Sequence, residues 1–257
     1  MSGPAGLGGR VALVTGATRG LGYAIALGLA EAGATVVVSS RKAEACEAAA
    51  EAITLATRES TGVAAVPLAL HVGRWDDIEP AIDRVYADLG RLDVLVNNAG
   101  IAPLSPSLEG VTEGLFDKTI EVNLKGPFRL MAVAGARMAA AGGGSIVNIS
   151  SIGAVRPSPP EAMYAASKSG LNALTMAFAQ EYAPHVRVNC VMPGAFATDM
   201  ADGWDEEFVG KVVDRLPAGR LGRPDEVVGM VVHLAGDSSG YTTGAVIPVD
   251  GGRTAVY

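Results

Sequence analysis

Seven short runs of mainly apolar, β-branched residues recur along the 257-residue chain and limit its possible folds more than any other feature. The runs are Val11–Val14, Thr35–Val38, Val63–Leu70, Leu92–Val96, Ser145–Ile149, Val186–Val191 and Ala245–Val249. Most successive positions in a run are apolar instead of alternating with polar ones, which is typical of strands buried on both faces of a parallel sheet. The sequence therefore predicts seven parallel strands covered by helices on both sides.

Longer segments between these runs predict the crossover helices. They are Leu21–Ala32, Ala43–Ala56, Asp76–Leu89, Glu113–Ala141, Ala162–Ala183 and Asp225–Ala235. The alternation indicates an α/β, doubly wound Rossmann-type fold with one domain over residues 1–257 and a ligand at the carboxyl ends of the strands. Residues 1–9 are small and Gly-rich, so we expect them to be mobile.

Composition excludes several classes of partner. With a net charge of −7 and scattered Lys and Arg residues, the chain lacks a basic surface for nucleic acid. Cys46 and Cys190 lack metal-ligand spacing, so we expect reduced thiols and no metal. No export signal begins the chain, and the longest uncharged stretch, residues 138–155, contains three consecutive glycines and several polar residues. We expect a cytoplasmic protein that does not enter a membrane.

The first strand leads directly into the segment Thr15–Gly22, with the sequence TGATRGLG, and then into a helix. Gly16 would allow a tight turn, Gly20 close approach of a ligand to the backbone, and Gly22 close packing of the helix. The start of the helix adds free N–H donors and a positive dipole. This context predicts a turn that binds the pyrophosphate of a dinucleotide.

Tyr164 and Lys168 are four residues apart near the start of a predicted helix, so both side chains would emerge on one face. Such a pair can act on one substrate or cofactor atom. The alternative is a solvated surface pair.

Together the segments Thr15–Gly22, Asn97–Gly100, Ser151, Tyr164–Lys168 and Pro193-Gly194 resemble the short-chain dehydrogenases/reductases over essentially the whole chain. The resemblance implies hydride transfer between a nicotinamide cofactor and a carbonyl or alcohol. The catalytic residues that it implies are Asn123, Ser151, Tyr164 and Lys168. Ser151 is favoured over its neighbour Ser150, whereas Asn123 has the alternative role of a buried amide that bends its helix.

The turn and the resemblance also imply the cofactor contacts. They are Gly16, Thr18, Arg19, Gly20, Leu21, Gly22, Ser40, Arg41, His71, Val72, Asn98, Ala99, Gly100, Tyr164, Lys168, Pro193, Gly194 and Thr198. Many relatives have an aspartate for adenine where this chain has His71-Val72, so recognition of adenine there is open.

The residues after the second strand favour NADP(H) over NAD(H), although NAD(H) use stays possible. Relatives that prefer NAD end this strand with an acidic residue, whereas this chain has Ser40 followed by Arg41. Arg41 and Arg19 could offer planar donors to a 2′-phosphate. The alternative is two solvated arginines.

Carbonyl reduction needs a proton donor at the oxygen, and resemblance assigns this role to Tyr164. Its pKa near 10 must fall by about three units to work near neutrality, which corresponds to roughly 4 kcal/mol. We expect Lys168 and the positive ring of the oxidised nicotinamide to lower it.

Substrate identity is less constrained by the sequence. The loop 156–161 should shape the pocket, and residues 195–220 form a candidate lid through Phe196, Met200, Trp204 and Phe208, which are alternatively ordinary packing residues. We expect a small ketone or alcohol in preference to a carrier-linked 3-oxoacyl thioester, because residues 139–144, before the fifth strand, include no basic residue for an acidic carrier.

Two further expectations concern the chain as a whole. A non-catalytic NAD(P)-binding sensor is the alternative to an enzyme. Relatives also suggest a homotetramer that packs the helices over 113–141 and 162–183, with small residues such as Ala132, Ala134, Ala136, Ala173 and Ala177 allowing close approach.

Overall fold

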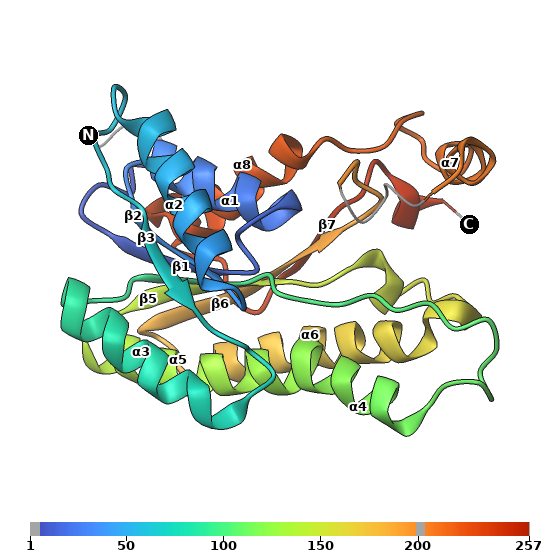
Figure 1. Ribbon diagram of the computed structural model, residues 1–257, viewed down its shortest axis with the longest axis horizontal. Coiled ribbons are helices and arrows are strands. Elements are labelled where there is room, and N and C mark those ends of the chain that lie inside the picture. Colours follow the sequence, from blue (N-terminus) through green and yellow to red (C-terminus); the bar gives the residue numbers. More distant parts are fainter. Residues whose placement is uncertain (1–5, 199–203, 257) are drawn as a thin grey trace.

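The computed structural model, described here for residues 6–198 and 204–256, has a parallel sheet in the order β3-β2-β1-β4-β5-β6-β7 (Figure 1). The strands are β1 Val11–Thr15, β2 Thr35–Ser40, β3 Val66–Ala69, β4 Val94–Asn97, β5 Gly144–Ile149, β6 Val186–Pro193 and β7 Val246–Val249. The chain moves outward from β1 to β3 and then returns to β4 beside β1. This reversal confirms the predicted doubly wound fold and creates the crevice in which such folds bind ligands.

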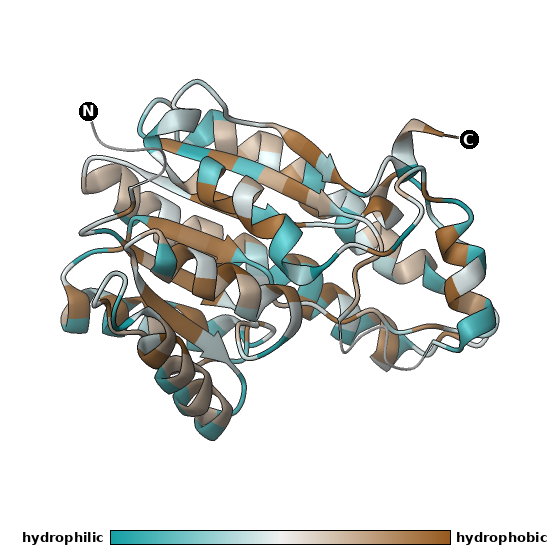
Figure 2. Ribbon diagram, turned by 90° about the horizontal axis from the view of Figure 1, so that it is seen from above, coloured by the Kyte–Doolittle hydropathy of each residue, from teal (hydrophilic) through white to brown (hydrophobic). Residues whose placement is uncertain are grey.

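Helices cover both faces of the sheet (Figure 1). On one face lie α1 Gly20–Glu31, α2 Ala43–Thr57 and α8 Val228–Ala235, and on the other lie α3 Trp75–Leu89, α5 Gly126–Ala140 and α6 Ala162–Glu181. Each helix contributes apolar side chains to a core on its own face, such as Leu29 of α1 and Leu171 of α6. The strands between these two cores are mainly apolar, with extensive brown ribbon in Figure 2, which is why most of their successive positions do not alternate with polar ones.

The third strand is shorter than the predicted Val63–Leu70, because α2 takes up the backbone groups of its first residues. The Thr57 hydroxyl donates to the Val63 carbonyl oxygen at 3.2 Å, and the Ala65 N–H donates to the Thr54 hydroxyl at 2.9 Å. Groups bonded in this way cannot pair with β2, so the ladder begins at Val66.

The predicted helix Glu113–Ala141 consists of three consecutive segments. These are α4 Glu113–Ile120, a π-helical segment Glu121–Lys125, and α5 Gly126–Ala140. A π-helical turn inside a longer helix is uncommon and often occurs at functional sites. Here it contains Asn123.

The sequence did not predict α7 Glu206–Val213, which lies within the candidate lid. The Asp205 side chain caps this helix by accepting a hydrogen bond from the Phe208 N–H at 2.7 Å. The segment 195–220 is therefore partly helical.

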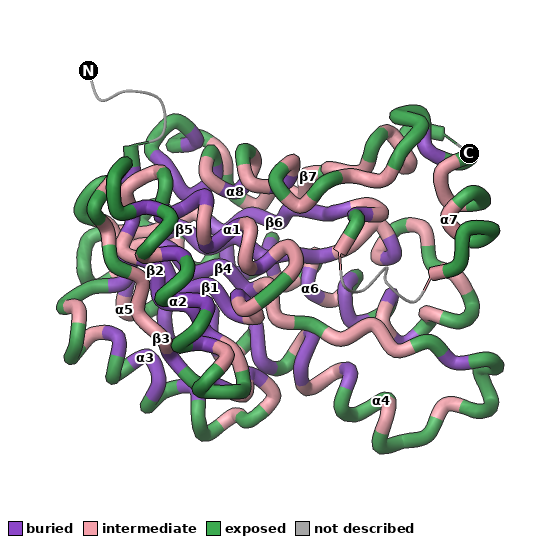
Figure 3. The backbone as a smooth tube through the Cα atoms, turned by 45° about the horizontal axis from the view of Figure 1, so that its top comes forward, coloured by how far each residue is buried: buried purple, intermediate pink, exposed green. Residues whose placement is uncertain are grey.

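Within the segment 1–9, which we expected to be mobile, Leu7 is anchored to the core. Leu7 is completely buried, and its N–H donates to the Ala32 carbonyl oxygen at 2.8 Å. Residues 1–5 lie outside the described part of the chain. Figure 3 shows the buried sheet in purple, with exposed backbone mainly on the outer helices and loops. None of the helices in the described part is both long and apolar enough to cross a membrane.

Candidate active site

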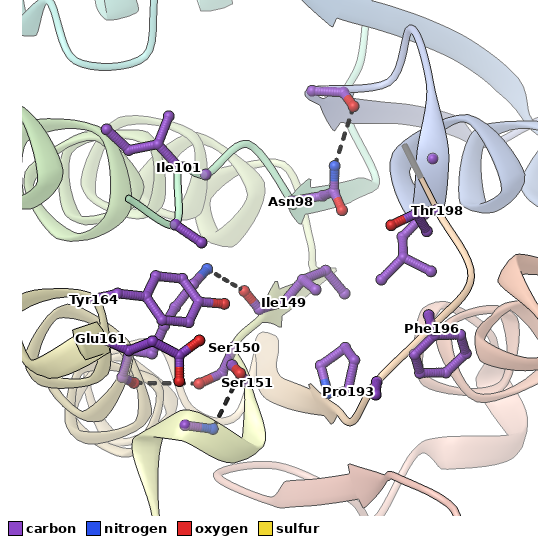
Figure 4. Close-up of a pocket in the computed structure, with 18 of the residues that line it drawn as sticks. Asn98, Ile101, Ile149, Ser150, Ser151, Glu161, Tyr164, Pro193, Phe196 and Thr198 are labelled. Atoms are coloured by element: carbon purple, nitrogen blue, oxygen red, sulfur yellow. Dashed lines mark hydrogen bonds between the residues drawn. The ribbon is translucent and has the colours of Figure 1, made fainter. Parts of the chain in front are cut away.

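A cavity of about 790 Å³ lies at the carboxyl ends of the strands, next to the point where the strand order reverses. Its walls include the segments that follow β1 to β6, together with parts of α4 and α7 and the C-terminal Arg253. Every residue that the sequence predicts as a cofactor contact lines this cavity, and so do Ser151, Tyr164 and Lys168. Figure 4 shows how several of these side chains converge from separate elements.

The turn after β1 has the backbone that a phosphate-binding loop requires. Gly16 and Gly20 have φ angles of 66° and 55°, which residues with a side chain rarely adopt. A Cβ on Gly22 would lie 2.2 Å from the Gly16 carbonyl oxygen, so α1 can approach the turn this closely only without a side chain there. The Thr198 side chain lies 3.7 Å from the position that a Cβ on Gly20 would take. The glycine pattern therefore forms an open cradle at the start of α1, which fits the phosphates of a dinucleotide.

Two adjacent asparagines at the end of β4 support the site through different partners. The Asn98 amide donates to the carbonyl oxygens of Thr15 and Gly16 at 2.9 and 3.2 Å, which fixes the phosphate turn. Asn97 is buried in the sheet, and its amide donates to the Asn148 side chain at 2.8 Å. The Thr15 hydroxyl accepts from the N–H groups of Asn98 and Ala99, a role for Thr15 that no sequence signal had identified.

Ser151 and Tyr164 meet in the cavity, as expected. Ser151 follows β5, and its hydroxyl accepts from the Gly153 N–H at 3.1 Å. A Cβ on Gly153 would lie 3.4 Å from the Ser151 hydroxyl and 3.6 Å from the Tyr164 ring, so the two side chains lie close together. The neighbouring Ser150 is buried, and its hydroxyl donates to the Lys168 carbonyl oxygen at 3.2 Å. The Ser150 hydroxyl is therefore bonded to the backbone of α6, whereas the Ser151 hydroxyl is not.

Lys168 is buried beneath Tyr164 on the same face of α6. Its ammonium group donates to the Ile149 carbonyl oxygen at 2.8 Å and lies 5.9 Å from the centre of the Tyr164 ring. Only 4% of Lys168 is exposed, which excludes a solvated surface pair. Burial lowers the pKa of Lys168 to about 8, so the group is still mainly charged at neutral pH.

The pKa of Tyr164 is shifted in the direction opposite to the expected one. Burial raises this pKa, the nearby Ser151 hydroxyl offsets part of that rise, and the negative charge of Glu161 raises it further. Lys168 is not among the causes of this shift, although we expected it to lower the Tyr164 pKa. The chain's own residues therefore favour the protonated phenol of Tyr164.

Asn123 is buried and does not line the cavity. Its side-chain oxygen accepts from the Ile101 N–H at 2.9 Å, and its amide donates to the Ile101 carbonyl oxygen at 2.8 Å and to the Ser167 hydroxyl at 3.1 Å. These bonds hold the loop after β4 against α6. A Cβ on Gly100, in the same loop, would lie within 3.5 Å of both Asn123 and Lys168.

The adenosine end of the cavity has no acidic residue at the end of β2. Ser40 and the exposed Arg41 line it from this strand, and Arg19 lines it from the phosphate turn. His71 also lines the cavity, and its Nδ1 accepts from the Gly73 N–H at 3.2 Å. That bond shapes the loop after β3.

The four apolar residues of the candidate lid differ in role. Phe196 is buried in the core beneath the site, where its ring would be 2.8 Å from a Cβ on Gly222. Trp204 and Phe208 line the cavity, with their ring centres 5.1 Å apart. Met200 lies outside the described residues.

Several charged cavity residues were not identified from the sequence. They are Lys118, Lys211, Arg215 and Arg253, while Arg156 and Glu161 belong to the loop that we expected to shape the pocket. The spacing of Trp204, Phe208, Lys211 and Arg215 at three or four residues is a helical signal that could have revealed part of this wall.

The chain has extensive similarity to known proteins. A family model described as Enoyl-(Acyl carrier protein) reductase matches residues 16–254, which include every residue of the cavity wall. The chain is 39% identical over 249 residues to Dehydrogenase/reductase SDR family member 4 of Homo sapiens, covering 96% of this chain and 88% of that protein. It is 38% identical over 247 residues to the 3-oxoacyl-(acyl-carrier-protein) reductase FabG of Thermotoga maritima, covering 95% and 97% of the two chains.

A solved structure is also similar to this chain in fold. The gluconate 5-dehydrogenase of Burkholderia cenocepacia, in complex with NADP and tartrate, matches with a TM-score of 0.93 and 34% identity. The match covers 99% of this chain and 98% of that chain.

Proposed function

Because the chain belongs to the short-chain dehydrogenase/reductase family of NAD(P)-dependent oxidoreductases, we propose that it transfers hydride between NADP(H) and a small ketone or alcohol, with Tyr164 as the acid/base. The observation that carries this proposal is the meeting of Ser151, Tyr164 and Lys168 in the cavity that also contains the glycine turn. We propose the same catalytic and cofactor-binding residues that the sequence predicts, except that Asn123 has a positioning role.

The cradle after β1 supports cofactor binding, because its glycines let the turn close tightly against the start of α1, whose first N–H groups have no partner within the helix and can bind phosphate oxygens. The reduced nicotinamide would supply the hydride. Arg41 and Arg19 support a preference for NADP(H), since their guanidinium groups match a 2′-phosphate and nothing acidic ends β2. NADP in the similar gluconate 5-dehydrogenase supports the same assignment.

In the reduction direction, the substrate oxygen would accept hydrogen bonds from Ser151 and Tyr164, and Tyr164 would give it a proton as hydride reaches the carbon. The raised pKa keeps Tyr164 in the protonated form that this step requires. The ammonium group of Lys168 would stabilise the phenolate that remains. Since one of its three N–H groups bonds Ile149, the others are available for the ribose of the cofactor.

We assign Asn123 a positioning role. Its amide is saturated by Ile101 and Ser167, so it would act by holding the loop that carries Gly100 beside Lys168. The family resemblance implies that Asn123 supports a water-linked proton relay, and this fixed loop would keep the geometry that such a relay needs. Its burial in a π-helical segment also fits the alternative of a buried amide that bends its helix.

A carrier-linked 3-oxoacyl thioester is a second candidate substrate, favoured by the similarity to FabG. The absence of basic residues at 139–144 does not argue against it, because this stretch connects α5 to the amino end of β5, whereas the cavity lies at the carboxyl ends of the strands. A pure NAD(P)-binding sensor is disfavoured, since cofactor binding alone would not need Ser151 and Tyr164 in contact.

We also propose a homotetramer that uses the outer faces of α5 and α6. Ala136, Ala173 and Ala177 are exposed there, next to the exposed apolar side chains of Phe128 and Met176. Ala134 is excluded from such an interface, because it is completely buried in the chain's own core.

The proposal is tested by titrating NADPH fluorescence and then measuring oxidation of NADPH with a panel of ketones and 3-oxoacyl thioesters. Tyr164→Phe should keep cofactor affinity and lower turnover by about 10² or more. Tyr241→Phe is the matched control, because Tyr241 is fully exposed and lies outside the cavity. Near-normal turnover by Tyr164→Phe would refute the acid/base assignment, and cofactor binding without turnover of any carbonyl would favour the sensor.

A further inference from the structure

The charge of the cavity wall is opposite to the charge of the protein. The chain carries a net charge of −7, yet the described residues that line the cavity include eight Lys or Arg residues and a single carboxylate, Glu161. Arg19, Arg41 and Lys168 belong to the proposed cofactor and catalytic groups. Five cations remain without an assigned role.

These five cations come from four separate segments of the cavity wall. They are Lys118 of α4, Arg156 after β5, Lys211 and Arg215 at α7, and Arg253 near the C-terminus. Figure 1 shows α4 and α7 at the same end of the molecule, on opposite sides of it. Cations that converge from several directions on a concave site focus a positive potential in it.

Two of the five are best suited to hold a ligand. The Arg156 guanidinium donates to the carbonyl oxygens of Thr254 and Val256, and Lys211 forms an ion pair with Glu207 at 2.6 Å. Neither Arg215 nor Arg253 has a carboxylate within ion-pair distance among residues 6–198 and 204–256.

Arg215 and Arg253 lie on segments that pack against each other. The Ala218 N–H donates to the Gly251 carbonyl oxygen at 2.9 Å, and a Cβ on Gly252 would lie 2.9 Å from the Pro217 ring. These contacts between residues 216–218 and residues 251–252 therefore hold Arg215 and Arg253 on the same wall of the cavity. Asp250, next to this wall, accepts hydrogen bonds from Gly252 and Thr254. Its charge also interacts with Arg253, which helps to lower the Asp250 pKa, but no ion pair forms between the two side chains.

We propose that the substrate carries an anionic group, a carboxylate or a phosphate, which Arg215 and Arg253 bind while its carbonyl or hydroxyl carbon reacts beside Tyr164. This inference rests on the proposed function and names the substrate class for the same site. Glu161 lies beside Tyr164 and would repel an anionic group placed there, so it directs that group toward the arginines. Trp204 and Phe208 give the intervening wall an apolar surface for the carbon chain.

The first measurement is kcat/KM with linear oxo-carboxylates of increasing length, their methyl esters and the matching oxoalkyl phosphates. We expect the best anion to exceed its neutral counterpart at least about tenfold, since hydrogen bonds to charged groups typically contribute this much. Added salt should reduce the preference. Arg215→Gln and Arg253→Gln should each lower kcat/KM for the anion and leave that for the ester nearly unchanged.

Arg58→Gln is the matched control. Arg58 is exposed at the end of α2 and outside the cavity, so its replacement removes the same charge without touching the proposed site. The control should keep the full preference for anions. The preferred anion, carboxylate or phosphate, identifies which of the two groups the site recognises.

A binding measurement keeps the inference separate from turnover. Trp204 lines the cavity, whereas the second tryptophan, Trp75, stacks on Phe128 outside it. In a Trp75→Phe background, Trp204 fluorescence should report binding of the oxo-carboxylate or oxoalkyl phosphate, and Arg215→Gln should weaken that binding about tenfold.

Several outcomes would overturn the inference. Equal or better reduction of the esters, or of a neutral 3-oxoacyl thioester, would refute it while leaving the proposed oxidoreductase intact. An equal loss for ester and anion in Arg215→Gln would also refute it. Anion binding that depends on Arg215 without reduction of any carbonyl would support the anion site and refute the proposed function, and neither binding nor reduction would refute both.

Discussion

Replacement of Arg41 by alanine tests the cofactor preference most directly. Arg41 is the first residue after β2, it lines the cavity, and it has no ion pair within the described residues. Arg41→Ala should therefore weaken NADPH and leave NADH unaffected, because only NADPH has a 2′-phosphate.

The expected size follows from the exposure of Arg41. A hydrogen bond between charged groups contributes about 1.5–3 kcal/mol, but solvent screens an exposed arginine and places this one near the lower limit. About 1.4 kcal/mol corresponds to a tenfold change. We therefore expect kcat/KM for NADPH to fall about tenfold and kcat/KM for NADH to stay within about twofold.

The assay is kcat/KM for both cofactors with one accepted carbonyl, at low and high salt. Arg58→Ala is the control, because Arg41 and Arg58 flank α2 at its two ends and are both exposed, but only Arg41 lines the cavity. Ser40→Asp, which adds an acidic residue at the end of β2, should favour NADH. Equal or better efficiency with NADH in the parent protein, or an equal loss for both cofactors in Arg41→Ala, would refute the assignment.

Three other measurements test separate parts of the site and the assembly. Gly22→Ala places a Cβ 2.2 Å from the Gly16 carbonyl oxygen, so NADPH affinity in a fluorescence titration should fall at least about tenfold. Gly229→Ala is the control, because there is open space around its Cβ, and it should leave NADPH affinity unchanged. Glu161→Gln removes a charge that raises the pKa of Tyr164; reduction needs the protonated phenol, so the fall of kcat/KM at high pH should begin at a lower pH than in the parent, and an unchanged profile would contradict this role. Light scattering should give about four times the monomer mass of 26.1 kDa, and a purely monomeric species at micromolar concentration would reject the tetramer.

Much of the fold could be predicted from the sequence, because its signals are local. Consecutive apolar positions in β1, β2 and β4 record burial on both faces, and the order of strands and helices then leaves few topologies. The glycine turn is equally local, since Gly16 and Gly20 adopt backbone angles that the residue type itself permits. The pairing of Tyr164 with Lys168 follows from the helical repeat alone.

Only the tertiary structure decided the features that depend on contacts between segments distant in the sequence. The first residues of the predicted third strand bond to Thr54 and Thr57 of α2, which no periodicity in that run could show. The role of Asn123 likewise depends on its hydrogen bonds with Ile101 and with Ser167 of α6.

The pKa shifts and the charge of the site could likewise be known only from the structure, because they also depend on contacts between segments that are distant in the sequence. The direction of the Tyr164 pKa shift is set mainly by burial of the phenol in the fold, which outweighs the opposing effect of Ser151. Scattered cations in an acidic sequence predict no binding site by themselves. Only the packing of residues 216–218 on residues 251–252 places Arg215 and Arg253 on one wall of the cavity.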